Sequence, residues 1–142
     1  MAIYSLSQRT ATGTSAVAMA ELRTSSSKRV KVLEIHVVMA AATASVFGIG
    51  RPAAIGITPT TPINLISEEP SDPTATSTTA LAWATPPTVP ANFFRRINLP
   101  ATIGAGQILT FPRGLIIPIS SSIVLWNTAS NGVVDLTFVV DE

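Results

Sequence analysis

The chain has 142 residues, of which 46% are hydrophobic and only 12% are charged, and its net charge is +1. This is the length of one domain with a sizeable core. The near-neutral charge argues against nucleic acid and membrane partners, and the absence of cysteine excludes disulfides and thiolate metal sites. A surface with so few charges is typical of a protein partly covered by other subunits.

The start of the chain, MAIYSLSQRTATG, does not have the basic and apolar segments of a signal peptide. The longest uncharged apolar stretch, 37–50, is shorter than a membrane-spanning helix requires. We therefore expect a soluble protein that is not exported by a cleaved leader.

Residues 1–28 are rich in Ser, Thr and Ala, with weak strand candidates at 3–7 and 17–22. We expect this segment to form an extended N-terminal arm. The first clear strand is 29–39 (RVKVLEIHVVM), which is rich in β-branched residues. Its alternation places Leu33, Ile35 and Val37 on one face and leaves the other face half exposed.

Further strands are predicted at 45–49, 81–84, 93–99 and 107–111, separated by many of the eleven prolines. Residues 58–79 (TPTTPINLISEEPSDPTATSTT) are predicted to form a long Pro- and Thr-rich loop. A connection of this length in a compact domain is usually functional or disordered.

The last segment, 133–142, alternates almost strictly, with Val134, Leu136, Phe138 and Val140 on the predicted core face. The short apolar run 123–126 precedes it, and Asn131-Gly132 between them is a favourable tight turn. The two runs are predicted to form an antiparallel hairpin, with Asp141-Glu142 at its end in solvent.

Many short strands separated by Pro, Gly, Ser and Thr turns predict an all-β protein. We expect residues 1–142 to form a single-domain antiparallel β-sandwich, jelly-roll-like, with an immunoglobulin-like topology as the alternative.

The sequence has no strong catalytic or metal-binding motif. Glu34 and the single histidine, His36, share a strand face, but further metal ligands are missing. GIGRPA at 48–53 fits the letters of a dinucleotide loop, yet the prolines after it forbid the helix that such a loop needs. We expect no catalytic residue, no metal and no cofactor. A small hydrolase that uses the carboxylates of Glu69 and Asp72 is kept as a third hypothesis.

Aromatic and charged residues outside the predicted core are candidates for protein contacts. Trp83 lies in the short run ALAWATPP, and Phe94 adjoins Arg95 and Arg96. The full candidate contact set is Tyr4, Arg9, Glu68, Glu69, Asp72, Trp83, Phe94, Arg95 and Arg96.

Several segments together resemble a known class of protein: SQRTATGT, FGIGRPAAIGITPTTP, ALAWATPPTVPANFFRRINLPATIGAG, TFPRGLIIPISSSIVLWN and the final VVDE. These segments are similar to the sequences of small virion proteins of tailed bacteriophages, in particular capsid cement (decoration) proteins. The resemblance implies a β-sandwich or jelly-roll domain that sits as a dimer or trimer on a symmetry axis of the shell. It also implies that the protein has no catalytic residues.

From this resemblance we expect a non-enzymatic structural virion protein on the outer surface of the capsid, made in the host cytoplasm. Its expected partners are the major capsid protein and itself, as a homodimer or homotrimer, with no nucleic acid and no membrane. The alternative is a neck, tail or fibre component that binds a glycan through Trp83.

Overall fold

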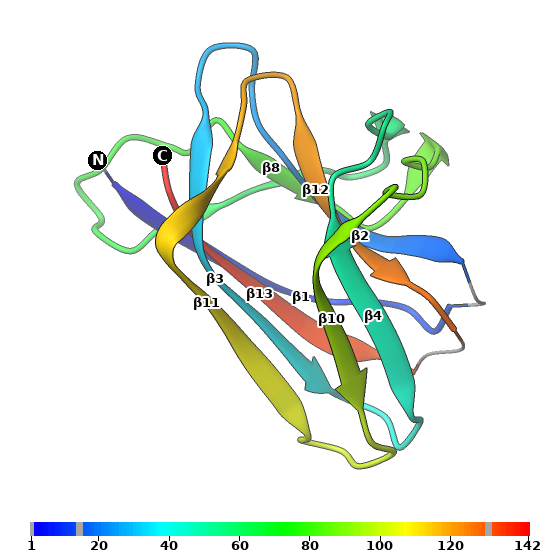
Figure 1. Cartoon of the computed structure of the whole chain (residues 1–142). Coiled ribbons are helices and arrows are strands. Elements are labelled where there is room, and N and C mark those ends of the chain that lie inside the picture. The colour runs from blue at the N-terminus through cyan, green and yellow to red at the C-terminus, as the bar shows by residue number, and fades with distance from the viewer. Residues whose placement is uncertain (1, 14–15, 130–131) are drawn as a thin grey trace.

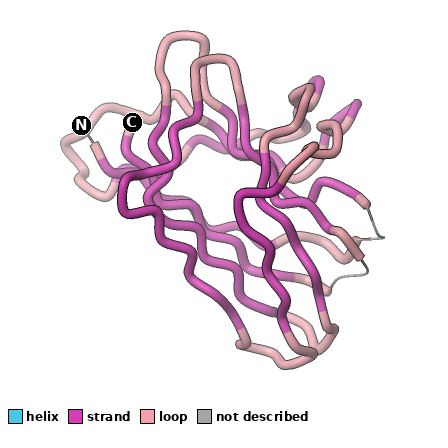
Figure 2. The backbone as a smooth tube through the Cα atoms, in the orientation of Figure 1, coloured by secondary structure: helices cyan, strands magenta, loops and turns pink. Residues whose placement is uncertain are grey.

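A computed structural model describes residues 2–13, 16–129 and 132–142, and these residues form strands and loops without a helix (Figures 1 and 2). The strands are β1 (Ile3–Arg9), β2 (Val17–Arg23), β3 (Val30–Met39), β4 (Ser45–Gly50), β5 (Ile57–Pro59), β6 (Ile63–Asn64), β7 (Ile66–Ser67), β8 (Thr78–Ala80), β9 (Trp83–Thr85), β10 (Phe93–Leu99), β11 (Gly106–Ile117), β12 (Ser122–Asn127) and β13 (Val134–Asp141).

The strands form two main antiparallel sheets. The five-stranded sheet has the order β11-β3-β13-β1-β7, and the six-stranded sheet has the order β10-β4-β12-β2-β8-β6. Except for the pair β4 and β10, long strands that follow one another along the chain lie in opposite sheets. This is the jelly-roll arrangement of a β-sandwich, so the predicted fold class is confirmed and the immunoglobulin-like alternative is wrong.

The predicted terminal hairpin is wrong. β12 pairs with β2 and β4, whereas β13 pairs with β1 and β3 in the other sheet. The connection therefore crosses the sandwich, and Asn131 of the predicted turn lies outside the described residues. Short turn-rich connections serve both to return within a sheet and to cross to a sheet packed about 10 Å away, so the local sequence did not distinguish them. The inward face of β13 is confirmed, because Val134, Leu136, Phe138 and Val140 are all buried.

The first 28 residues do not form an extended arm. β1 lies between β13 and β7, and β2 lies between β12 and β8. Tyr4 and Leu6 of β1 are buried in the core. The strand β1 is rich in Ser and looks weak locally, but it is stabilised by seven register pairs with β13 at the other end of the chain.

A register shift in β3 changes which of its residues face the core. The pairing with β13 shifts between Val139 and Val140, which are opposite Glu34 and Val32. As a result Val30 and Val32 are buried together with Ile35 and Val37, and Leu33 is only half-buried. The predicted strand is confirmed, but the inward position of Leu33 is wrong because a bulge reverses the alternation.

The long connection between β4 and β10 closes one side of the sandwich. Its residues form β5 to β9, so the segment 58–79 is not a structureless loop. β7 extends the five-stranded sheet beside β1, and β8 and β6 extend the six-stranded sheet beside β2. Leu65 is buried between β6 and β7. The opposite side of the sandwich is bounded by the outer strands β10 and β11 (Figure 1).

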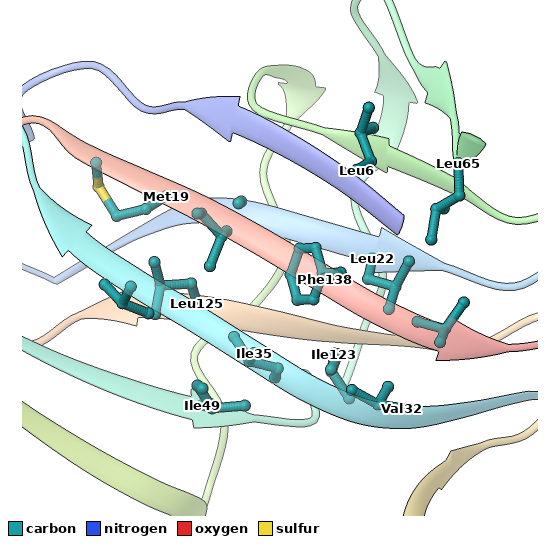
Figure 3. Close-up of a cluster of buried hydrophobic side chains, with 14 of the residues drawn as sticks. Leu6, Met19, Leu22, Val32, Ile35, Ile49, Leu65, Ile123, Leu125 and Phe138 are labelled. Carbon is teal, nitrogen blue, oxygen red and sulfur yellow. The ribbon is translucent and has the colours of Figure 1, made fainter. Parts of the chain in front are cut away.

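The core lies between the two sheets, as Figure 3 shows. The five-stranded sheet contributes Ile35 and Phe138, and the six-stranded sheet contributes Leu22, Ile49 and Leu125. Branched aliphatic residues dominate this layer, as expected for two packed sheets. Phe47 and Trp126 are also buried, whereas Phe111 is only half-buried.

Candidate protein-contact site

The open side of the sandwich presents two outer strands next to each other. β11 pairs only with β3 and β10 pairs only with β4, so one edge of each strand is left without a neighbouring strand. Large apolar side chains are exposed here, including Ile108 and Ile116 on β11 and Phe94 on β10. Exposed strand edges with apolar side chains favour contact with another protein.

A register shift in β10 determines how its aromatic and basic side chains point. Phe93 is opposite Gly50 and Arg95 is opposite Ile49, so Phe94 is the extra residue at the irregularity. Arg95 therefore lies on the same side as buried Ile49, at the rim of the sandwich. Arg96 is opposite Gly48 and lies on the outer face of the sheet. The shift brings Phe94 and both arginines to the surface.

The glycine opposite Arg96 is required for this arrangement. A Cβ atom added at Gly48 would lie 2.4 Å from the ring of Phe93. The ring therefore packs flat against the strand where only glycine leaves room. Packing therefore explains the glycine at position 48 of the GIGRPA segment.

Three arginines stack on three phenylalanine rings at this side of the molecule. The guanidinium carbon lies 5.2 Å from the ring centroid in the pair Arg51 and Phe94, 5.4 Å in the pair Arg95 and Phe111, and 4.9 Å in the pair Arg96 and Phe93. These distances are within the range of attractive cation–π contacts. We call these six residues the Arg–Phe edge. The pair Arg95 and Phe111 joins β10 to β11 across the open side.

No arginine of the Arg–Phe edge has a carboxylate partner in the described parts of the chain. The ion pairs among the described residues join Arg9 to Asp135, Arg23 to Glu21, Lys28 to Glu142 and His36 to Glu34. Arg51 instead donates to the carbonyl of Ile116, and Arg95 donates to the carbonyl of Phe94 at 2.8 Å. Held in place but not neutralised, these guanidinium groups can bind carboxylates of a partner.

Two shallow cavities adjoin the Arg–Phe edge. One of ≈ 260 Å³ is lined by Arg51, Phe93 and Phe94, and one of ≈ 380 Å³ by Arg95, Phe111 and Pro112 together with neighbouring residues. Arginine and aromatic residues beside such hollows are the composition that protein interfaces favour.

The structure brings together only part of the contact set predicted from the sequence. Phe94, Arg95 and Arg96 form one surface, as described. Tyr4 is fully buried, and its hydroxyl donates to the carbonyl of Pro73 at 2.8 Å. Its assignment as a contact residue is wrong, because it packs in the core.

Arg9 is exposed but lies away from the Arg–Phe edge, at the end of β1. It forms a bidentate pair with Asp135, with distances of 2.7 and 2.9 Å. The hydrogen bond from Arg9 lowers the pKa of the Asp135 carboxyl, and the opposite charge adds to the effect.

Trp83 holds the connection between β4 and β10, residues 51–92, against the six-stranded sheet, and we call this connection the insertion. Its indole N–H donates to Glu21 at 2.7 Å, and a Cβ atom at Gly56 would lie 2.2 Å from its ring. Glu21 is fully buried and also accepts bonds from the Gly56 amide and the Ser122 hydroxyl, at 3.1 and 2.6 Å. The indole N–H and the ring of Trp83 thus make contacts within the protein itself.

Glu68, Glu69 and Asp72 lie on a loop that follows β7, at the far edge of the five-stranded sheet from β11. The Glu68 amide donates to the carbonyl of Ile3 at 2.9 Å, and the Asp72 amide donates to that of Glu69 at 3.0 Å. The Glu69 carboxylate accepts from the hydroxyl of Ser71 at 3.2 Å. This loop is ordered by its own hydrogen bonds.

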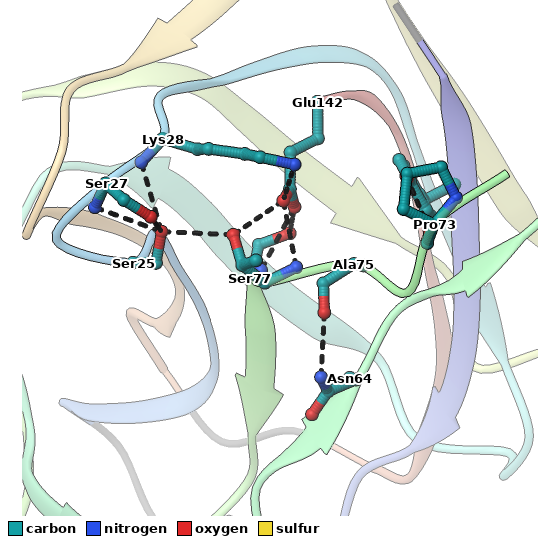
Figure 4. A network of polar contacts seen from close by, with 10 residues as sticks. Ser25, Ser27, Lys28, Asn64, Pro73, Ala75, Ser77 and Glu142 are labelled. Carbon is teal, nitrogen blue, oxygen red and sulfur yellow. Dashed lines mark hydrogen bonds and ion pairs between the residues drawn. The ribbon is translucent and has the colours of Figure 1, made fainter.

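Glu142 is not in solvent, and neither is Asp141. The Glu142 carboxylate accepts bonds from the backbone amides and hydroxyls of Thr76 and Ser77, and Lys28 lies 3.4 Å away (Figure 4). Burial would raise the pKa of this carboxyl, but the hydrogen bonds from Ser77 and Thr76 outweigh it and lower the pKa to about 2. The network ties the insertion to the last strand, which the sequence did not reveal.

Glu34 and His36 are paired at 2.8 Å, as their shared strand face predicts. Among the described residues, no group of three or more His, Asp or Glu side chains could hold a metal ion. No helix within the described ranges has the length and apolar character needed to cross a bilayer.

The sequence pointed to FFRR but missed Arg51 and Phe111. The four adjacent residues are a local signal, whereas Arg51 follows β4 and Phe111 lies in β11. Arg51 reaches the site because β4 pairs with β10, and Phe111 reaches it because the fold places β11 on the same side as β10. No protein-family model, curated protein or solved structure matches this chain.

Proposed function

We propose that the chain is a non-enzymatic structural virion protein. Its specific role is that of a capsid cement (decoration) protein of a tailed bacteriophage, which binds the lattice of the major capsid protein on the outside of the head. The observation that carries this proposal is the Arg–Phe edge, with three stacked arginines that have no carboxylate partner among the residues that the structure describes. The resemblance of the sequence to cement proteins supports the choice of partner.

The Arg–Phe edge suits repeated, moderately weak contacts on a lattice. Stacking on phenylalanine orders each guanidinium before binding, so less side-chain entropy is lost when a partner carboxylate is bound. When many copies bind one shell, their weak contacts reinforce each other by raising the effective concentration of binding sites. No copy then needs a single strong contact patch. A compact jelly roll also supplies a rigid body that can span neighbouring capsid subunits.

The proposal is tested by sedimenting the purified protein with capsids of the phage that encodes it. Wild type should sediment at a fixed ratio to the major capsid protein. Phe94→Ala and Arg95→Ala should each weaken binding about tenfold or more, as for central interface residues. Arg9→Ala is the matched control, because it removes an exposed arginine that lies elsewhere and should leave binding unchanged.

Failure of wild type to sediment with capsids would refute the cement role. Equal binding by wild type and both variants would refute the Arg–Phe edge as the contact.

The alternative is a neck, tail or fibre component that uses the same surface against other virion proteins. Sedimentation with purified tails but not with heads would favour it. Its glycan-binding form rests on Trp83, whose indole N–H already donates to Glu21 and is therefore not available to a sugar. A glycan screen with wild type and Trp83→Ala should therefore give no difference.

A further inference from the structure

Unpaired charges of opposite sign are segregated on this molecule. Of the nine Lys and Arg residues, three form ion pairs with carboxylates: Arg9, Arg23 and Lys28. The other six have no carboxylate within 4 Å among the described residues, and they are Arg29, Lys31, Arg51, Arg95, Arg96 and Arg113. They lie on β10, on β11, at the start of β3 and just after β4, toward the open side.

Most of the unpaired acids lie at the other edge, and the exception is the buried Asp141 at the end of β13. Glu68, Glu69 and Asp72 form no ion pair with a described residue, and they belong to the loop after β7. Pro70 and Pro73 restrict this loop, and backbone bonds fix its ends. We call residues 68–72 the acidic loop.

A basic pocket lies at the corresponding end of the five-stranded sheet. Its volume is ≈ 400 Å³, and Arg29, Lys31 and Arg113 line it around Val30 and Ile116. Gly114 has a φ of 69° and packs so closely against the aliphatic stem of Lys31 that a Cβ atom there would lie 2.2 Å from it. Lys31 is thereby held at the wall of the pocket.

Two carboxylates also border the basic pocket. Glu142 is already neutralised by Lys28 and by hydrogen bonds from Thr76 and Ser77. Asp141 is 6% exposed, and its Oδ1 has no hydrogen-bond partner within the described ranges. Three cations against one uncompensated carboxylate leave the pocket positively charged.

The pocket and the acidic loop lie at the same end of one sheet but at opposite edges. Asp141 is opposite Lys31 on one side and opposite Ile3 on the other, and the Glu68 amide donates to Ile3. The row from the pocket to the loop therefore runs β11, β3, β13, β1, β7.

We propose that the basic pocket of one copy receives the acidic loop of a second copy, so that subunits join head to tail. Three unpaired carboxylates meet three unpaired cations, and the loop is rigid before binding. Because the two surfaces differ and lie at opposite edges, the contact is heterologous and gives a closed ring or a chain. It leaves Phe93, Phe94 and Arg96 free, and it does not depend on the proposed lattice contact.

The test is the mass in solution, measured by light scattering after size exclusion. Wild type at about 100 μM should be larger than a monomer in about 50 mM salt and should dissociate at least about tenfold more readily in about 500 mM salt. Arg29→Glu disables the pocket, and the pair Glu68→Lys with Glu69→Lys disables the loop. Each of these variants alone should be a monomer at low salt.

Mixing the two disabled variants provides the sharpest readout. The intact acidic loop of Arg29→Glu can bind the intact basic pocket of the variant with Glu68→Lys and Glu69→Lys. The mixture should therefore form a dimer and nothing larger. Arg96→Glu is the matched control, since it reverses an arginine outside the pocket and should keep the wild-type mass.

A wild-type monomer at low salt would overturn the proposal, as would an oligomer unaffected by either variant. The two proposals can fail separately. Monomeric Arg29→Glu should still sediment with capsids, although less firmly than the assembled wild type. Loss of self-association therefore leaves the cement role standing, and loss of capsid binding leaves the head-to-tail contact standing.

Discussion

Glu142 is the carboxylate whose protonation should affect stability most. Its folded pKa of about 2 lies below the ordinary value of 4.5, so its stabilising effect is complete above pH 4.5 and is lost as the pH falls toward 2. We expect this loss to be about 2 kcal/mol, because solvent screening reduces the full effect of the shift. Urea unfolding of wild type at several pH values between 7 and 2.5 measures it.

Glu142→Gln isolates this contribution. The variant should be less stable than wild type at pH 7, and its stability should change less between pH 4.5 and 2.5. Asp135→Asn is a control, because Asp135 also has a lowered pKa but lies at the surface beside Arg9. Identical pH dependence in wild type and Glu142→Gln would show that the bonds to Thr76 and Ser77 do not stabilise the folded state.

Glu21 is the second carboxylate that binds the insertion to the sandwich. Glu21→Ala leaves the donors on Gly56, Trp83 and Ser122 without their buried acceptor. We expect a loss of about 3 kcal/mol, because each unpaired buried donor costs free energy. Tryptophan fluorescence during urea unfolding reports both the loss and any separate release of Trp83. A change below about 1 kcal/mol would contradict the role given to Glu21.

The strand β11 owes its shape to an irregularity in its middle. Its pairing with β3 is interrupted between Thr110 and Leu115, and Pro112 and Gly114 lie in the gap. A proline and a break in an outer strand limit the addition of further strands. The bend at Gly114 also places Lys31 at the basic pocket.

Substitution of Gly114 tests this bend. Gly114→Ala should destabilise the fold by about 2 kcal/mol, since it combines a positive φ with a clash against Lys31. Gly104→Ala is a matched control, because Gly104 has a φ of 85° but its Cβ would enter open space. If both variants lost the same free energy of unfolding, the close contact between Gly114 and Lys31 would not affect stability.

Local patterns predicted strands better than they predicted the pairing of those strands. The alternation of 133–142 was sufficient to identify β13 and its buried face, because a period of two is a property of neighbouring residues. Whether β12 returns beside β13 or crosses to the other sheet depends on the whole jelly roll. For the same reason the sequence predicted Phe94, Arg95 and Arg96 as one group, but it did not predict that Arg51 after β4 and Phe111 of β11 join them.

The first and last strands, β1 and β13, pair with each other in the five-stranded sheet, and this pairing decides what removal of the first segment would do. If residues 1–12 formed an arm, a chain of residues 13–142 would fold normally and lose only contacts with partners. β1 instead pairs along its length with β13, and it contributes Tyr4 and Leu6 to the core. The shortened chain would expose an edge of β13 and a part of the core. We expect it to lack a cooperative thermal transition by circular dichroism, whereas Arg9→Ala in the same strand should change stability by less than about 1 kcal/mol. A shortened chain that melts cooperatively near the wild-type temperature would mean that β1 is dispensable, and residues 1–12 would then be free to act as a contact arm on a neighbouring subunit.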